Sequence, residues 1–206
     1  MLFKISHPLI NVKLSRMRDK NTESVKFRRN LVELSEFMAY EVTKNYKTIA
    51  TSITTPLAKT KGFKLEAPIV LVPILRAGLG MIDGFLSLIP NAPTGFIGLY
   101  RNEENLQPVQ YYCKLPKCTK GANVIILDPM LATGNSSVEA INIVKKYQPA
   151  SIKLVCIVSA PIGIKNVMAK HKDVDIYTAA VDAKLNKNGY IIPGLGDAGD
   201  RIFGTK

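Results

Sequence analysis

Hydrophobic and polar positions along the chain form blocks whose period changes from one block to the next. The run Asn123 to Leu127 is short, apolar and rich in Val and Ile, which is typical of a strand buried on both faces of a parallel sheet. Polar residues begin at Asp128, and Pro129 favours an extended backbone at that aspartate. From Ser136, apolar residues recur at helical spacing as far as Gln148-Pro149. This stretch therefore predicts a strand, a polar loop and a helix in succession.

The predicted loop carries small polar residues and leads into a capping pattern. Ser136 and Glu139 have the S-x-x-E spacing of a capping box, and Gly134 can adopt a positive φ. A helix start of this kind presents free backbone N–H groups and the positive end of a helix dipole. The loop can therefore hold a phosphate, and the equally weighted alternative is an ordinary strand-to-helix connection with a cap.

The same block structure recurs over the rest of the chain. Apolar positions three or four residues apart predict a long amphipathic helix from Val25 to about Thr43. Residues 43–66 show no firm period beyond a turn near Thr54-Thr55-Pro56, and the polar segment after a short strand over residues 2–5 is interpreted as an arm. Strand and helix patterns then alternate, with strands expected over 68–75, 96–100, 109–115, 151–159 and 174–178, and helices ending near 88 and covering 162–170. The predicted fold class is α/β, a doubly wound, mostly parallel sheet flanked by helices.

Charged residues follow three of the predicted strands, namely Arg76, Arg101 and Asp128. Ligands bind beyond the carboxyl ends of the strands in open α/β sheets, so we expect these side chains at one edge. A carboxylate repels phosphate, so Asp128 is expected to accept hydrogen bonds from neutral hydroxyls such as those of a ribose. The inferred ligand is a sugar phosphate, and the alternative for Arg76 is a surface salt bridge. The polar segment 102–108 is expected to form a mobile hairpin over the site.

Length and composition predict one domain over residues 1–206. The chain is 47% hydrophobic, which suffices for one sizeable core. Its first twenty residues contain no long apolar stretch, so neither a signal peptide nor a membrane span is expected, and the predicted location is the cytoplasm. Cys113, Cys118 and Cys156 fit no zinc spacing, so no metal is expected to be held by protein side chains.

The net charge of +12 is concentrated at the amino end of the chain. Residues 1–30 hold eight Lys or Arg against Asp19 and Glu23, which gives +6, half of the total. A polyanionic substrate, an acidic partner or a solvated basic face would each account for this excess, and the solvated face is the commonest outcome. Nucleic acid is therefore not the expected partner.

Four segments of the chain stand out together, namely Asp128-Pro129-Met130-Leu131-Ala132-Thr133-Gly134, Val72 to Gly80, Gly98 to Glu104 and Gly189 to Asp200. They resemble the motifs of one family, the uracil phosphoribosyltransferases of the type I phosphoribosyltransferase class. The first segment resembles that family's motif for phosphoribosyl pyrophosphate (PRPP). The similarity runs nearly end to end and is weakest over residues 43–66. One departure is Asn135, where the family usually has a second glycine.

The resemblance implies the transfer of the phosphoribosyl group of PRPP to uracil, giving UMP and pyrophosphate. It also implies magnesium bound mainly through PRPP, a homo-oligomer and GTP as a candidate activator. Arg76, Arg101 and Asp128 are carried over as catalytic residues. Uracil is assigned to Ile191, Gly196, Asp197 and Ala198, and PRPP to Arg76, Arg101, Asp128, Pro129, Met130, Leu131, Ala132, Thr133, Gly134, Asn135, Ser136 and Asp197.

The segment that ends the chain contains a misleading motif. Gly194-Leu195-Gly196-Asp197-Ala198-Gly199 matches the dinucleotide fingerprint G-x-G-x-x-G. Only seven residues follow it, too few for the helix, the second strand and the acidic residue of a Rossmann unit. A glycine-rich loop can instead approach a flat ligand closely with its backbone, so a base pocket is predicted here. The alternatives are an RNA-binding regulator on the same fold and, less favoured, an enzyme acting on a purine.

Overall fold

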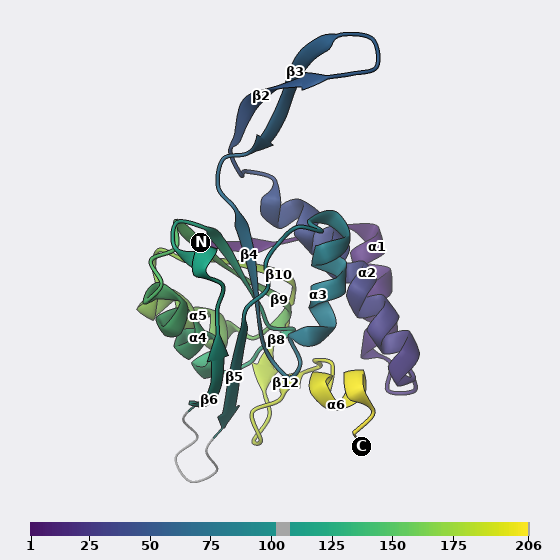
Figure 1. The fold of residues 1–206 in the computed structure, drawn as a ribbon. Coiled ribbons are helices and arrows are strands. Elements are labelled where there is room, and N and C mark those ends of the chain that lie inside the picture. The colour runs from purple at the N-terminus through teal and green to yellow at the C-terminus, as the bar shows by residue number, and fades with distance from the viewer. Residues whose placement is uncertain (102–107, 206) are drawn as a thin grey trace.

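The computed structural model describes residues 1–101 and 108–205, and for Arg101 it describes the backbone alone. Eight strands form one sheet (Figure 1), in which every pairing is parallel except that of β5 with β6. This confirms the predicted mostly parallel sheet. In spatial order the strands are β1 (Leu2–Lys4), β10 (Asp175–Val181), β9 (Ser151–Ser159), β7 (Asn123–Leu127), β4 (Ile69–Leu75), β5 (Phe96–Arg101) and β6 (Pro108–Lys114), and β8 (Met130–Leu131) also pairs with β9.

Helices cover both faces of this sheet (Figure 1), as a doubly wound fold requires. Leu71 and Ile125 point to the face covered by α1 (Pro8–Arg18), α2 (Ser24–Thr43) and α3 (Leu79–Leu88). Val70 and Ile126 point to the opposite face, which is covered by α4 (Asn135–Lys145) and α5 (Pro161–Lys170). Successive residues of β4 and β7 therefore enter two different cores, which is why these strands have continuous apolar runs rather than alternation.

Two segments differ from the sequence-based interpretation. The expected arm is the helix α1, which begins with Pro8 and is capped by His7, whose Nδ1 accepts from the Leu9 N–H at 3.2 Å. Residues 43–66 contain an antiparallel hairpin, β2 (Thr48–Thr54) and β3 (Lys59–Leu65), around the predicted turn. Most of its residues are exposed, so its strands lack the apolar alternation that would have revealed them. The hairpin projects away from the sheet (Figure 1).

The order of the strands reverses direction between β4 and β7. The connection from β4 through α3 leads to β5 on one side, whereas the connection from β7 through α4 leads to β9 on the other. Such a switch point leaves a crevice beyond the carboxyl ends of the two central strands. Among the described residues, no helix is both long enough and apolar enough to cross a membrane.

Candidate active site

The three predicted strand-end residues follow three neighbouring strands of the sheet, β7, β4 and β5. Pro73 of β4 is paired with Leu127 of β7, so Arg76 and Asp128 both lie just beyond this edge. Leu75 is paired with Gly98, and the backbone of Arg101 ends the neighbouring strand β5. The segment after β4 also approaches β7 very closely, because a Cβ on Gly78 would lie 2.4 Å from the carbonyl oxygen of Leu127. Only glycine allows the two loops to meet in this way.

Asp128 is a half-buried carboxyl group with an unusual protonation equilibrium. Burial raises its pKa to about 7, while hydrogen bonds from the Met130 N–H and the Ser137 hydroxyl act in the opposite direction. The Met130 N–H lies 3.4 Å from the Asp128 Oδ1. Removal from water is therefore the dominant influence on the pKa of Asp128. Two or more hydroxyl donors from a ligand would favour the charged form and replace part of the lost hydration.

The rest of the loop is attached to strand β9 and helix α5. The Pro129 carbonyl accepts from the N–H groups of Ile157 and Val158 at 3.1 and 3.0 Å, and the Leu131 carbonyl accepts from Ala160 at 2.8 Å. These bonds fix the loop at the sheet edge before α4 begins. Its backbone geometry is therefore set by the sheet and does not depend on a bound ligand.

The start of α4 corrects one expectation from the sequence. Gly134 is the N-cap, in the left-handed conformation with φ 82°, and no side chain caps the helix, so the predicted capping box of Ser136 and Glu139 is wrong. Asn135, which stands where the family usually has a second glycine, is the first helical residue and has no positive φ. The Asn135 Oδ1 accepts from Asn166 Nδ2 at 2.9 Å, and Asn166 Nδ2 also donates to the Thr133 carbonyl at 2.9 Å. Uncapped N–H groups of the first turn remain suited to an anion.

The chain ends in a compact segment that reaches the same edge. A small antiparallel pair, β11 (Lys184–Leu185) and β12 (Ile191–Ile192), leads into the glycine-rich loop and the short helix α6 (Ala198–Phe203). Ile191 and Ala198 are buried, whereas Gly196 is exposed. Asp197 caps α6, and its Oδ1 accepts from the Asp200 N–H at 3.0 Å. This contact of the Asp197 carboxylate is local to the turn that precedes α6.

An ion pair joins the two parts of the site. Arg76 Nη2 lies 3.3 Å from the Oδ1 of Asp200, and the Arg76 side chain is 56% exposed. The predicted PRPP residue Arg76 therefore touches the predicted base segment. Because the guanidinium is largely solvated, this ion pair stabilises the fold little and leaves Arg76 accessible to an anionic ligand.

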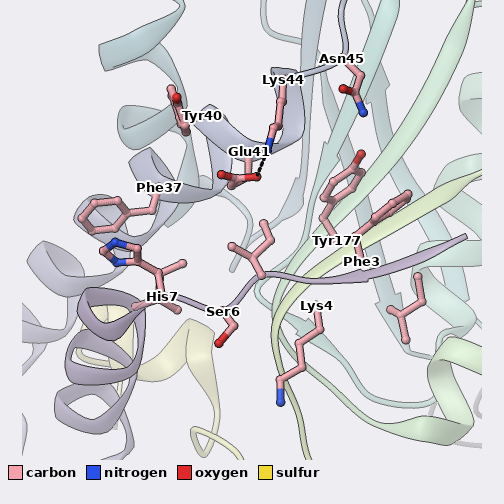
Figure 2. A pocket seen from close by; sticks show the side chains of 13 residues that line it. Phe3, Lys4, Ser6, His7, Phe37, Tyr40, Glu41, Lys44, Asn45 and Tyr177 are labelled. Carbon is pink, nitrogen blue, oxygen red and sulfur yellow. Dashed lines mark ion pairs between the residues drawn. The ribbon is translucent and has the colours of Figure 1, made fainter.

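A cavity of about 760 Å³ lies elsewhere, between β1 and α2 (Figure 2). Phe3 stacks on Tyr177 there, with ring centroids 4.7 Å apart, and Glu41 pairs with Lys44 at 3.8 Å. None of the residues predicted for PRPP or uracil lines this cavity, among those whose side chains the structure describes. The assignment of the site therefore rests on the strand ends and their loops.

The sequence interpretation missed a set of arginines that hold the carboxyl-terminal segment. Arg28 Nη1 donates to the Ile202 carbonyl at 2.7 Å, and Arg201 Nη1 donates to that of Leu195 at 2.9 Å. Arg18 donates to the Gly194 carbonyl at 2.9 Å and pairs with Asp182. For Arg18 and Arg28 the signal in the sequence was the basic excess of residues 1–30, which does not include Arg201. Part of that excess is used within the fold, which weakens the interpretation of this region as an RNA-binding face.

The mostly parallel sheet flanked by helices is the fold of type I phosphoribosyltransferases, and comparisons with known proteins identify the family. A hypoxanthine phosphoribosyltransferase from Staphylococcus aureus shares the fold, with a TM-score of 0.52 at 13% identity over 77% of this chain and 76% of the other. The family model for uracil phosphoribosyltransferase matches residues 4–205. The chain therefore belongs to the uracil phosphoribosyltransferase family, as the sequence resemblance predicted.

Relatives in this family are similar over their whole length. A uracil phosphoribosyltransferase of Ureaplasma urealyticum is 62% identical over 203 residues, 98% of each chain, and one of Malacoplasma penetrans is 57% identical over 206 residues, all of both chains. The solved structure of the AQ2163 protein from Aquifex aeolicus has a TM-score of 0.95 at 43% identity, covering 98% of each chain.

The raised pKa of Asp128 predicts a pH dependence of stability. Between about pH 4 and 7 the native carboxyl keeps a proton that the unfolded chain has lost, so stability falls as pH rises through this window and levels off above it. Asp128→Asn removes this contribution. From pH 5 to pH 8 the parent should lose stability relative to the variant, by on the order of 1 to 3 kcal/mol. Urea unfolding of both proteins at the two pH values measures this, and parallel pH profiles would refute it.

The left-handed Gly134 predicts which substitution damages the loop. A Cβ there would lie 2.8 Å from the Gly163 carbonyl oxygen, at a φ that disfavours L side chains. Strain of about 1 to 3 kcal/mol would displace the loop, so Gly134→Ala should weaken PRPP binding by about tenfold or more. Asn135→Ala, one residue later at a helical φ, is the matched comparison and should lose less affinity for PRPP. Calorimetric Kd values for PRPP decide between them, and equal losses in the two variants would contradict the assigned geometry.

Proposed function

We propose that this enzyme transfers the phosphoribosyl group of PRPP to uracil, giving UMP and pyrophosphate. The observation that carries the proposal is the meeting of three parts at one sheet edge: the Asp128 loop, Arg76 and the segment from Ile191 to Asp200. They supply a hydroxyl acceptor, a cation for pyrophosphate and a backbone-lined base pocket.

PRPP is held by the loop after β7. The uncapped N–H groups at the start of α4, in the region of Thr133 to Ser136, bind the 5′-phosphate, and Asp128 accepts from the ribose hydroxyls. The Pro129 to Ala132 backbone holds these groups in place. In this arrangement the Asp128 carboxylate lies away from the phosphate, and the anomeric carbon lies beyond the carboxyl ends of the central strands.

Catalysis consists mainly of alignment and charge stabilisation. Uracil attacks the anomeric carbon as the bond to pyrophosphate breaks, through a transition state that resembles an oxocarbenium ion. Arg76 and Arg101 stabilise the negative charge that develops on the leaving pyrophosphate, and Asp197 is proposed as a further PRPP contact. Holding base and sugar in line supplies much of the remaining acceleration.

Uracil is read by backbone groups of the carboxyl-terminal segment around Ile191, Gly196, Asp197 and Ala198. In uracil one ring N–H lies between two carbonyls, so a backbone acceptor flanked by donors recognises it. Cytosine presents the opposite polarity at its amino group and would leave buried polar groups unpaired. Ile191 and Ala198 are buried, so their backbone atoms are held by packing.

Magnesium is proposed as a cofactor that PRPP carries into the site. Within the described part of the chain, no three His, Cys, Asp or Glu side chains are grouped so that they could hold a metal ion. Asp128 would offer a carboxylate oxygen at this edge, the kind of ligand that Mg²⁺ prefers, and the substrate would supply the other oxygen ligands. When bound, the ion neutralises part of the charge of the pyrophosphate.

The hairpin of β2 and β3 supports the proposal of a homo-oligomer. It projects from the sheet and exposes apolar side chains, among them Leu57 at 97% and Phe63 at 68%. Exposed apolar groups on a protruding element are typical of a surface that a partner covers. A second copy of the chain is the proposed partner.

Three further proposals concern organisation and regulation. Residues 1–206 form one catalytic domain. The enzyme works in the cytoplasm, which accords with three free cysteines, one of them the exposed Cys118. GTP is proposed as an activator from the family resemblance, and we assign no residues to it.

The proposed reaction predicts strong selectivity for one base. Incubation with PRPP and magnesium should convert uracil to UMP, whereas cytosine, adenine and guanine should react poorly because they leave polar groups unpaired. Chromatography of the nucleotide products measures this, with magnesium omitted in a parallel series. Absence of UMP at saturating PRPP would refute the enzyme, and an equal yield from a purine would refute the base assignment.

The hairpin predicts a mass in solution above that of one chain. Light scattering should give a multiple of 22.6 kDa. The double variant Leu57→Asp, Phe63→Asp should shift the protein towards 22.6 kDa, because charge in an apolar interface is costly to desolvate. Val25→Asp, at a 67% exposed position on α2, is the matched control and should keep the parent mass. A monomeric parent would refute the oligomer, and an unshifted double variant would remove the hairpin from its interface.

A further inference from the structure

A buried ion pair lies beside the proposed base segment. Arg18 is the last residue of α1, and Asp182 follows β10 directly, so the two lie 164 residues apart in sequence. The guanidinium contacts both carboxylate oxygens at 2.7 Å, in the fork geometry of a bidentate pair. The Asp182 side chain is 7% exposed and that of Arg18 is 24% exposed, so water screens this interaction weakly.

Both members of the pair also hold the backbone of Gly194. The Gly194 N–H donates to the Asp182 Oδ2 at 2.8 Å, and the Gly194 carbonyl accepts from Arg18 Nη1 at 2.9 Å. Both polar groups of this peptide residue are thereby satisfied by one ion pair. Gly194 stands between Ile191 and Gly196, two positions assigned to uracil. Its location therefore sets where the flanking backbone lies.

Asp182 is itself fixed to the sheet. Its N–H donates to the carbonyl of Ser159, the last residue of β9, at 2.8 Å. Burial alone would raise the pKa of Asp182, but the hydrogen bonds from Arg18 and from the Gly194 N–H lower it below its ordinary value. The carboxylate is thus charged at neutral pH and forms a rigid link from the sheet edge to the loop.

We propose that Arg18 and Asp182 are positioning residues for base recognition, which hold the Gly194 loop so that its neighbours present their backbone to uracil. This inference rests on the proposed function of the segment and adds a role for two residues outside it. A buried ion pair often contributes little to net stability, because desolvation of the charges offsets their attraction. Geometric control of a loop that has few side chains of its own is a better-supported use.

The proposed role predicts that substitutions of the ion pair weaken the binding of uracil more than the binding of PRPP. Arg18→Lys keeps the charge but cannot span both carboxylate oxygens and the Gly194 carbonyl, so KM for uracil should rise about tenfold. PRPP is held mainly by the loop after β7 and contacts the displaced segment only at Asp197, so its Kd should rise much less than KM for uracil. Asp182→Asn retains an acceptor for the Gly194 N–H and should have a KM for uracil between those of the parent and of Asp182→Ala.

Steady-state kinetics, calorimetry with PRPP alone and thermal unfolding test this on the full chain. Lys13→Gln is the matched control. Lys13 lies on the same helix as Arg18, its side chain is 17% exposed, and it also forms an ion pair. Its partner is Glu33 of α2, however, so this ion pair does not involve the Gly194 loop. Lys13→Gln should leave both substrate constants unchanged. The proposal is overturned if Arg18→Lys and Asp182→Asn keep the parent KM for uracil, or if uracil and PRPP binding weaken equally in both. A parent that forms no UMP would refute the proposed function as well.

Discussion

The parallel pairing of β4 with β7 determines where the site of this enzyme lies. The two strands run side by side from Ile69 and Asn123 to their carboxyl ends, and the chain leaves them in opposite directions. Their loops would collide in a sheet of ordinary side chains. Gly78 removes the obstacle, since only its missing Cβ allows the first loop to pass the Leu127 carbonyl. Arg76 and Asp128 thus lie at one edge of the sheet as a consequence of strand register.

The site places demands that oppose stability. A half-buried carboxyl whose pKa is raised to about 7 and a helix start without a side-chain cap both leave polar groups incompletely satisfied in the free protein. The fold compensates with backbone bonds from β9 to Pro129 and Leu131, which hold the loop without help from its ligand. Preorganised polar groups of this kind act on a substrate without a further ordering cost when it binds.

The sequence predicted those parts of the molecule in which local pattern and burial agree. The strand from Asn123 to Leu127 and its neighbour were predictable because each is apolar on both faces. The β2 and β3 hairpin was not, because its side chains are mostly exposed and carry no period. The start of α4 was mispredicted for a different reason. A capping box would place Ser136 just before the helix, but the helix already begins at Asn135, and the spacing of two residue types cannot show at which residue a helix starts.

The arginines around the carboxyl-terminal segment were beyond local pattern altogether, and their presence follows from what a base pocket requires. Two strands of two residues and a helix of six bury too little apolar surface to hold themselves in place. Larger side chains in the loop would help, but they would cover the backbone groups to which we assign the base. Arg18 and Arg28 instead reach across from the first two helices and bond loop and helix carbonyls directly. The basic amino end and the glycine-rich carboxyl end are therefore two parts of one structural arrangement.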